Sequence, residues 1–158
     1  MTPSPARVAR RHQAAIPLPP VRQETGWTCG AAALRAVLSL HGVELDEAAL
    51  ADAIGTNPDQ GSSPEAMAAT AVLLGMDASV ERLDLGSLRE LLTSEPPAIL
   101  NLQAWGEGHF AVAVSAERCG FTLADPYSGR RVALTPAELE ARWHGDDGRD
   151  HLAVVVRP

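Results

Sequence analysis

Residues 26–42 read GWTCGAAALRAVLSLHG, and this stretch decides how the chain begins to fold. Leu34 and Leu38 lie four positions apart, which places them on the same face of a helix. Gly42 follows, and glycine readily takes the left-handed conformation that ends a helix. The stretch therefore predicts a helix that begins at or just after Cys29 and ends near Gly42.

Helix-start signals recur further along the chain. A Ser, Thr or Asp side chain accepts a hydrogen bond from the first turn of a helix, and Pro is favoured at the first helical position. The segment TPAELEARW joins a cap, a proline and a capping-box glutamate in this order. On such signals and on apolar spacing we expect four more helices, which follow Asp46, follow Ser62 or Ser63, lie near residues 87–92 and begin at Pro136.

The apolar period shortens in the second half of the chain, where short β-prone runs are joined by polar connections. Helices first and antiparallel strands later predict an α+β domain with the helices packed to one side of the sheet. The three runs that begin at His109 are expected to form an antiparallel meander. The expected strands lie near residues 76–82, 97–103, 109–115, 120–125, 130–135 and 151–158.

Length and composition favour one folded domain. The chain has 158 residues, of which 46% are hydrophobic and 21% charged, and this suffices for a core without disulfides. Residues 1–20 are rich in Pro, Ala and Arg and are expected to form a flexible N-terminal arm, with residues 21–158 as the domain. We find no apolar run that could span a bilayer and no secretory signal, so we expect a cytoplasmic protein without membrane insertion.

Charge and residue types exclude several function classes. A formal net charge of −7 argues against nucleic acid as a partner, because binding phosphates requires a basic surface. All 13 positively charged side chains are Arg, and without lysine neither a P-loop nor a Schiff base can form. The run HGDDGRDH at residues 144–151 matches no metal-ligand spacing and is expected to be a solvated loop. We therefore expect neither a metal nor a cofactor.

Cys29 stands where a loop enters the first helix, and this position can activate a thiol. The N–H groups of a helix's first turn have no intrahelical partner and carry partial positive charge. Such a charge favours the thiolate, which is the nucleophilic form of cysteine. A lone cysteine is nonetheless more often a small core residue. The interpretation as a nucleophile therefore needs a base and an orienting group elsewhere in the chain.

His109 and Asp125 can supply these two groups. In the run HFAVAVS, Phe110 and Val112 point to one face of the strand, which places His109 on the other. A three-residue hairpin loop at 116–118 sets His109 opposite Asp125, within reach of a hydrogen bond that fixes the imidazole tautomer. A two-residue loop instead puts the two side chains on opposite faces, so the pairing depends on the length of the loop.

Further side chains are candidates for the same site. Gln23 precedes Cys29 by six positions, and its amide can donate a hydrogen bond to an oxyanion together with the backbone N–H of Cys29. Trp27 and Trp105 each precede a candidate residue by a few positions and either wall a substrate cleft or anchor two loops. Cys119 is expected in a turn at the far end of the hairpin, away from the site.

Taken together, RQETGWTCGAAALRAVLSLHG, GHFAVAV and LADPYSG resemble the C39-like peptidases, a papain-like group of cysteine peptidases. The resemblance runs roughly over residues 18–143. Matched residue by residue, Gln23 resembles the family's oxyanion glutamine and Cys29 its nucleophile. His109 resembles its base and Asp125 its orienting acid. The resemblance implies a papain-like fold in which N-terminal helices pack on a C-terminal antiparallel sheet.

The resemblance also implies an activity. A C39-like peptidase cleaves a peptide bond through a thioester intermediate, and its best known substrates are leader or precursor peptides. Two other functions stay open. An acyl or aminoacyl transferase uses the same thioester and passes the acyl group to an amine in place of water. A non-catalytic module keeps the cleft and binds a peptide without cleaving it.

Overall fold

The structure is a computed structural model, and it describes residues 18–104 and 106–158. Most of the expected N-terminal arm, residues 1–17, therefore lies outside the described part of the chain. At the start of the described part, Leu18 packs against the hydrophobic core. Packing of the chain therefore begins no later than Leu18.

In the described part of the chain, three helices form the N-terminal half of the molecule, and all three lie where the sequence predicts them. Their limits follow local signals: α3 begins where the Asp46 carboxylate accepts a hydrogen bond from the Ala49 N–H at 2.7 Å. It ends at Gly55, which adopts a left-handed conformation. The three helices are α2 (Cys29–Leu40), α3 (Glu47–Ile54) and α4 (Pro64–Leu73).

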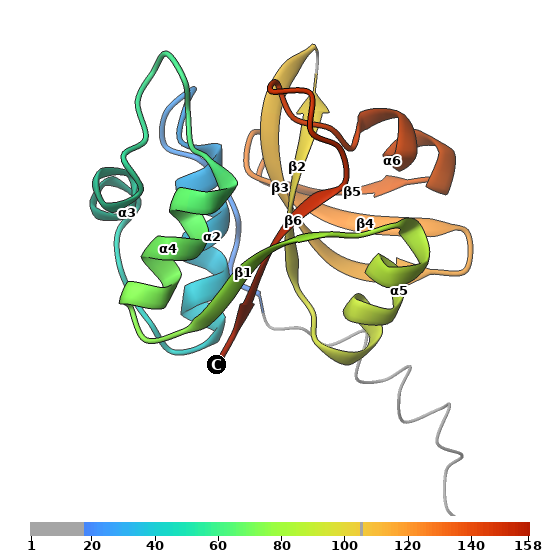
Figure 1. The fold of residues 1–158 in the computed structure, drawn as a ribbon, viewed down its shortest axis with the longest axis horizontal. Helices are drawn as coiled ribbons and strands as arrows, with labels where there is room; N and C mark the ends of the chain where they lie inside the picture. Colours follow the sequence, from blue (N-terminus) through green and yellow to red (C-terminus); the bar gives the residue numbers. More distant parts are fainter. Residues whose placement is uncertain (1–17, 105) are drawn as a thin grey trace, which may run out of the picture.

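Among residues 18–104 and 106–158, six strands form one antiparallel sheet in the order β1-β6-β2-β3-β4-β5 (Figure 1). The sheet contains the expected meander, and the last strand inserts between the first and the second. The strands are β1 (Asp77–Arg82), β2 (Ala98–Ala104), β3 (Glu107–Glu117), β4 (Gly120–Asp125), β5 (Arg130–Leu134) and β6 (Leu152–Arg157). Two further helices, α5 (Leu85–Ser94) and α6 (Pro136–Arg142), connect β1 to β2 and β5 to β6.

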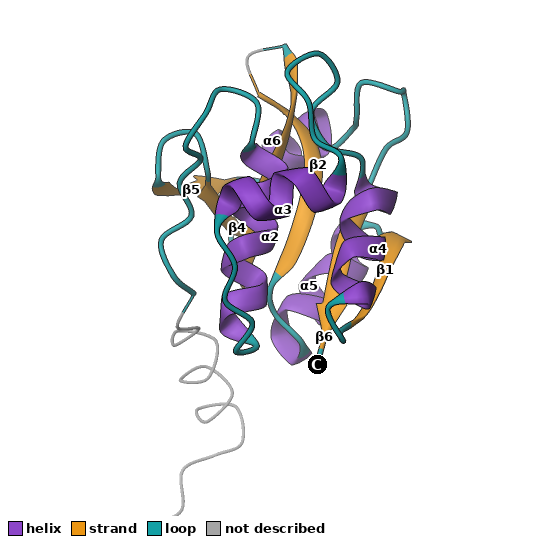
Figure 2. Ribbon diagram, turned by 90° about the vertical axis from the view of Figure 1, so that its left-hand side faces the viewer, coloured by secondary structure: helices purple, strands orange, loops and turns teal. Residues whose placement is uncertain are grey.

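Helices cover both faces of this sheet. α2, α3 and α4 lie on one side, and α5 and α6 on the other (Figure 1, Figure 2). Along β3, Phe110 and Val112 pack with the N-terminal helices, whereas Ala111 and Ala113 pack with α5 and α6. The α+β class and the packing of the N-terminal helices on the sheet are confirmed. The expectation that all helices lie to one side is wrong for α5 and α6, because the second face is also apolar and needs cover.

The loop of the β3–β4 hairpin has two residues, 118–119, between the paired ends of the strands. The expected three-residue loop at 116–118 is therefore wrong. Taken alone, a two-residue loop would place His109 and Asp125 on opposite faces of the sheet, since side chains alternate along a strand.

A β-bulge restores the shared face. Between Ala113 and Ser115 the β3 strand carries one extra residue relative to β4, and the register shifts by one position. His109 and Asp125 consequently point to the same face, as diagonal rather than directly opposite neighbours. The shared face expected from the sequence is present in the structure, although it arises from the bulge and not from the loop.

Candidate active site

Cys29 is the first residue of α2, and its side chain is partly buried. The N–H groups of this first turn have no acceptor inside the helix, and the side chain of the preceding Thr28 does not cap them. Their partial positive charge lies beside the thiol of Cys29. The predicted place of Cys29 at a helix N-terminus is confirmed.

Gly30, the next residue, lets the start of α2 approach the segment before α4. A Cβ atom at this position would lie 2.7 Å from the hydroxyl oxygen of Ser62 and 2.8 Å from its Cβ. Real side chains do not pack at such distances. Any larger residue would therefore push the start of α2, and Cys29 with it, away from this segment.

His109 and Asp125 form a largely buried polar pair across β3 and β4. The imidazole Nε2 lies 2.6 Å from Oδ1 of the Asp125 carboxylate, and His109 is only 9% exposed. Since an ionised carboxylate can only accept hydrogen bonds, Nε2 carries the hydrogen, and Nδ1 remains for the thiol of Cys29. The carboxylate is itself held by the backbone N–H groups of Tyr127 and Ser128, at 3.1 and 3.3 Å.

The surroundings of this pair favour its charged forms. Burial lowers the pKa of His109, but the hydrogen bond and charge of Cys29, followed by those of Asp125, outweigh burial and leave this pKa above its ordinary value. Burial raises the pKa of Asp125, but hydrogen bonds from His109, Ser128 and the Tyr127 N–H outweigh this effect and leave it below its ordinary value. The arrangement therefore favours an imidazolium next to a carboxylate.

We expect the stability of the protein to fall as the pH rises above 6.5. The folded state binds the His109 proton more tightly than the unfolded state, so this contribution is complete below pH 6.5 and is lost as the pH passes the raised folded-state pKa. Urea unfolding at a series of pH values measures how the free energy of unfolding changes with pH, and this change should be smaller in His109→Gln. The same pH dependence in the wild type and in His109→Gln would contradict a raised pKa of His109 in the folded protein.

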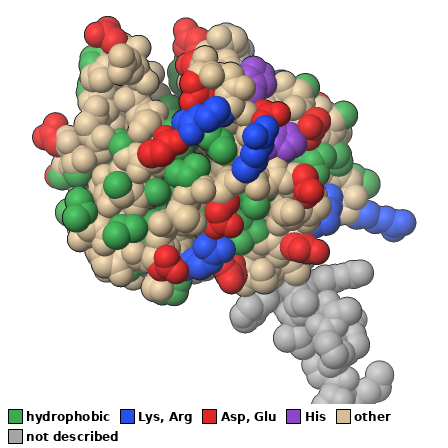
Figure 3. Space-filling view, in the orientation of Figure 1, with side chains coloured by type: hydrophobic (Ala, Val, Ile, Leu, Met, Phe, Trp, Pro, Cys, Tyr) green, Lys and Arg blue, Asp and Glu red, His purple; other side chains and the backbone are tan. Residues whose placement is uncertain are grey.

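A cleft of about 590 Å³ opens between the helical half and the sheet. Four of the predicted site residues line it together, namely Gln23, Trp27, Cys29 and His109. Asp125 is not among the lining residues, and it contacts His109 from outside the cleft. In the space-filling view the molecule is hollowed between its two halves at the upper edge (Figure 3).

Gln23 is held on the wall of this cleft by its main chain and its side chain. Its backbone N–H donates to the carbonyl of Pro126 at 2.8 Å, which ties it to the segment after Asp125. Its amide nitrogen donates to the Thr25 carbonyl at 2.7 Å. Because an amide nitrogen carries two hydrogens, one N–H is left for a substrate.

Of the two tryptophans predicted to wall the cleft, only Trp27 lies within the described residues. Trp27 is partly buried and lines the cleft. Trp105 lies outside the described residues, so its place beside the substrate stays a prediction.

The segment 144–150 contributes a wall of the cleft, which the sequence did not indicate. Most of the segment is exposed, as expected, but Asp146 lines the opening, and its carboxylate accepts a hydrogen bond from Nε2 of Gln103 at 2.8 Å. Gly108 permits this approach, because a Cβ atom there would collide with the Asp146 carboxylate. Only the folded chain reveals this contact, since the partners are far apart in the sequence.

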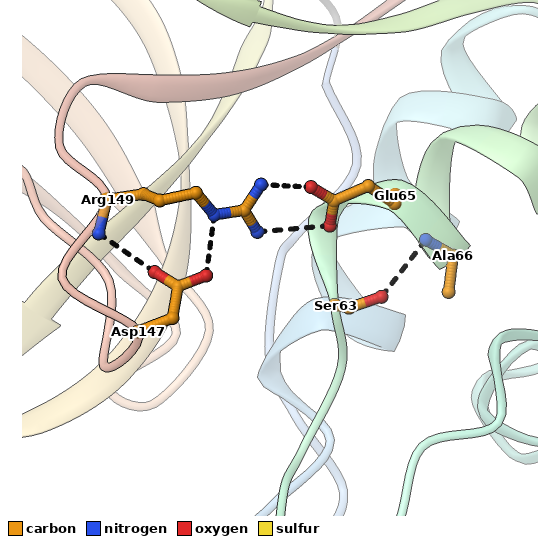
Figure 4. Close-up of polar contacts among 5 residues, drawn as sticks. All are labelled: Ser63, Glu65, Ala66, Asp147 and Arg149. Atoms are coloured by element: carbon orange, nitrogen blue, oxygen red, sulfur yellow. Dashed lines mark hydrogen bonds and ion pairs between the residues drawn. The ribbon is translucent and has the colours of Figure 1, made fainter.

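The same segment joins the two halves of the molecule. Arg149 forms ion pairs with Glu65, in the first turn of α4, and with its neighbour Asp147 (Figure 4). Hydrogen bonds from Arg149 hold the pKa of both carboxyl groups below the ordinary value. Because exposed ion pairs contribute little to stability, this bridge orients the segment more than it stabilises the fold.

Within residues 18–104 and 106–158, no group of His, Cys, Asp and Glu side chains is arranged to hold a metal ion. None of the helices in these ranges is long and apolar enough to cross a membrane. Cys119 is exposed in the hairpin loop, at the end of β3 opposite to His109, and both it and Cys29 are free thiols.

Sequence comparisons find similar proteins over most of the chain. The model of the Peptidase C39 family matches residues 18–146. An uncharacterised protein of Methanothermobacter marburgensis is 34% identical over 110 residues, which cover 70% of this chain and 72% of that protein. The "Probable functional amyloid protease FapD" of Pseudomonas aeruginosa is 32% identical over 133 residues, which cover 79% of this chain and 57% of the relative.

The fold is similar to that of solved structures. A crystal structure of a double glycine motif protease from an AMS/PCAT transporter, in complex with the leader peptide, aligns with a TM-score of 0.74 at 21% identity. The alignment covers 90% of this chain and 93% of that chain. The papain-like peptidase fold expected from the sequence is thus confirmed. Since the family model matches most of the length of this chain, the chain belongs to the Peptidase C39 family.

Proposed function

We propose that this protein is a cysteine peptidase, with Cys29 as the nucleophile, His109 as the acid and base, and Asp125 as the orienting group. The observation that carries the proposal is that Cys29 and His109 line the same cleft, while the His109 imidazole is hydrogen-bonded to the Asp125 carboxylate. Membership of a peptidase family supports the same activity.

In the proposed reaction, the Cys29 thiolate attacks the carbonyl carbon of the substrate, which forms a C–S bond and moves the charge onto the carbonyl oxygen. This oxyanion accepts hydrogen bonds from the backbone N–H of Cys29 and from the remaining amide N–H of Gln23. The His109 imidazolium then gives a proton to the leaving amine as the C–N bond breaks, and a thioester remains.

Water completes the proposed cycle. The neutral imidazole of His109 takes a proton from a water molecule as this water attacks the thioester, and the Cys29 thiolate leaves. Asp125 keeps the hydrogen on Nε2, so that Nδ1 is the nitrogen that exchanges the proton with the reacting groups.

The proposed substrate is a leader or precursor peptide. The similar solved structure contains a double glycine motif protease with its leader peptide, and the Pseudomonas relative is named as a protease of functional amyloid. A second hollow shares Cys29 and Gly108 with the main cleft and continues past the thiol. A peptide therefore has room to extend on both sides of the nucleophile.

The reactivity of the two cysteines tests the proposal. We expect iodoacetamide to alkylate Cys29 at least about tenfold faster than Cys119 at pH 7, because an unassisted thiol is only a few per cent thiolate at this pH. His109→Gln should remove most of this preference. Cleavage after arginine separates the two cysteines, so mass spectrometry measures both rates in one sample. Equally slow alkylation of Cys29 and Cys119 would favour a module that binds a peptide without cleaving it.

Gln23→Ala is expected to slow peptide cleavage without abolishing it. The loss of one oxyanion donor costs on the order of 10² to 10³ in kcat, while the backbone N–H of Cys29 remains as the second donor. Steady-state kinetics should show this fall in kcat with little change in KM, and Arg22→Ala, an exposed neighbour, serves as the control. Unchanged kcat in Gln23→Ala would remove Gln23 from the reaction.

A further inference from the structure

Glu47 is a buried carboxylate that no step of the proposed reaction uses. It is the first residue of α3 and is only 1% exposed. One of its oxygens, Oε1, is buried without a hydrogen-bond partner among the described residues, where Glu47 also forms no ion pair. Burying a carboxylate in this way costs free energy, and a helix N-terminus offsets only part of that cost.

The other oxygen of Glu47 binds the loop that leads into α2. Oε2 accepts the backbone N–H of Glu24 at 2.7 Å and the hydroxyl of Thr28 at 2.8 Å. Thr28 is itself only 3% exposed. Its hydroxyl oxygen also accepts the backbone N–H of Thr25 at 3.2 Å, which closes the loop on itself. The buried carboxylate thus fixes both ends of a five-residue loop, 24–28, through a single oxygen atom.

The two bonded residues are the neighbours of the two proposed oxyanion donors. Glu24 follows Gln23, whose side-chain amide is one donor, and Thr28 precedes Cys29, whose backbone N–H is the other. An oxyanion hole works only if its donors are held at the right separation before the charge develops. A shared acceptor for the adjacent residues sets such a separation.

We infer that Glu47 is a positioning residue that holds the Gln23 and Cys29 donors at their working separation. The inference rests on the proposed function, because the oxyanion arises only in that reaction. It accounts for a buried carboxylate whose hydrogen bonds, as far as the chain is described, go only to this loop. Glu47 touches neither the substrate nor the reacting atoms and acts through the loop alone.

The test compares two reactions of the same thiol in the full chain, with Cys119 replaced by alanine. Acylation by p-nitrophenyl acetate passes through a tetrahedral oxyanion, whereas alkylation by iodoacetamide displaces iodide and forms none. In Glu47→Ala we expect acylation to fall on the order of ten- to a hundredfold, less than the 10² to 10³ of a deleted donor, with alkylation changed less than about threefold. Glu44→Ala, an exposed carboxylate on the same side of the molecule, is the matched control.

Two conservative variants keep the test decisive if Glu47→Ala does not fold. Glu47→Gln retains an oxygen that can accept both hydrogen bonds and should recover most of the acylation rate. Thr28→Val keeps the shape of the side chain but removes its hydrogen bond to Glu47, together with the one that it accepts from the Thr25 N–H. It should lose acylation selectively, by a smaller factor than Glu47→Ala. Parallel loss of both reactions in the folded variants, or unchanged acylation, would overturn the positioning role.

Failure of the proposed role of Glu47 can be distinguished from failure of the proposed peptidase activity. If Cys29 is acylated no faster than Cys119 in the wild-type chain, which keeps both cysteines, the proposed peptidase fails, whatever the Glu47 variants do. If the wild type is acylated rapidly and Glu47→Ala equally so, the peptidase stands and the role of Glu47 falls.

Discussion

Cys29→Ala is expected to reduce peptide cleavage by a factor on the order of 10⁵ to 10⁶, to below detection in an ordinary assay. The proposed reaction forms its covalent bond at this sulfur, and no other group in the described cleft can replace a thiolate. The fold should survive, because the side chain is only partly buried and alanine is a good helix former at the start of α2.

Cys119→Ala is the matched control for this prediction. Cys119 is exposed in the β3–β4 loop, so its replacement should leave kcat unchanged. Cleavage is best followed by mass spectrometry with candidate precursor peptides, and thermal unfolding confirms that both variants fold. Activity of Cys29→Ala close to that of the wild type would end the case for a cysteine peptidase.

His109→Gln is expected to cost nearly as much as the loss of the thiol, on the order of 10⁴ to 10⁶ in kcat. In the proposed reaction His109 protonates the leaving amine, and the pKa of this imidazole is raised by Cys29 and Asp125, which keeps the proton available. Because the two residues act as one unit, Cys29→Ala combined with His109→Gln should be no slower than Cys29→Ala alone.

Asp125→Ala should have a smaller effect than His109→Gln, since the imidazole remains and loses only its orientation. We expect kcat to fall by a factor on the order of 10⁴ in Asp125→Ala, which is between the factors expected for His109→Gln and Gln23→Ala. Single-turnover kinetics gives this ranking directly when four variants are compared, namely Cys29→Ala, His109→Gln, Asp125→Ala and Gln23→Ala. A loss in Asp125→Ala larger than that in His109→Gln would mean that the carboxylate does more than hold Nε2.

The local parts of the fold were predictable because local chemistry determines them. Asp46, Ser63 and Thr135 cap helices by accepting hydrogen bonds from their own first turns, and the sequence shows such caps directly. Cys29 at a helix start belongs to the same class of prediction. Each of these contacts joins residues only three positions apart, so no tertiary information is needed.

The register of the β3–β4 hairpin was not predictable in the same way. The sequence allowed a shared face for His109 and Asp125 only with a three-residue loop, whereas the chain has a two-residue loop and a bulge after Ala113. A bulge depends on how one strand packs against helices and neighbouring strands, and nothing in the run HFAVAVS marks it. The contact between His109 and Asp125 is therefore present for a reason that the sequence did not contain.

Glu47 and Asp146 were missed for a related reason. Both are acidic residues in polar surroundings of the sequence, where solvent exposure is the ordinary expectation. Glu47 is buried because the loop before α2 folds over the start of α3, and Asp146 reaches the cleft because its segment crosses to Gly108. These contacts join residues 19 to 43 positions apart, beyond the range of any periodicity.

The extra residue in β3 also limits how the gene can change in length. In-frame loss of the codon for Val114 would only remove the bulge, because Ala113 would still pair with Leu123 and Ser115 with Thr122, and His109 and Asp125 would keep their shared face. Loss of one codon between His109 and Ala113 would instead turn the His109 side chain to the face opposite that of Asp125. Single-codon deletions should therefore be tolerated at the bulge and not in the part of the strand before it.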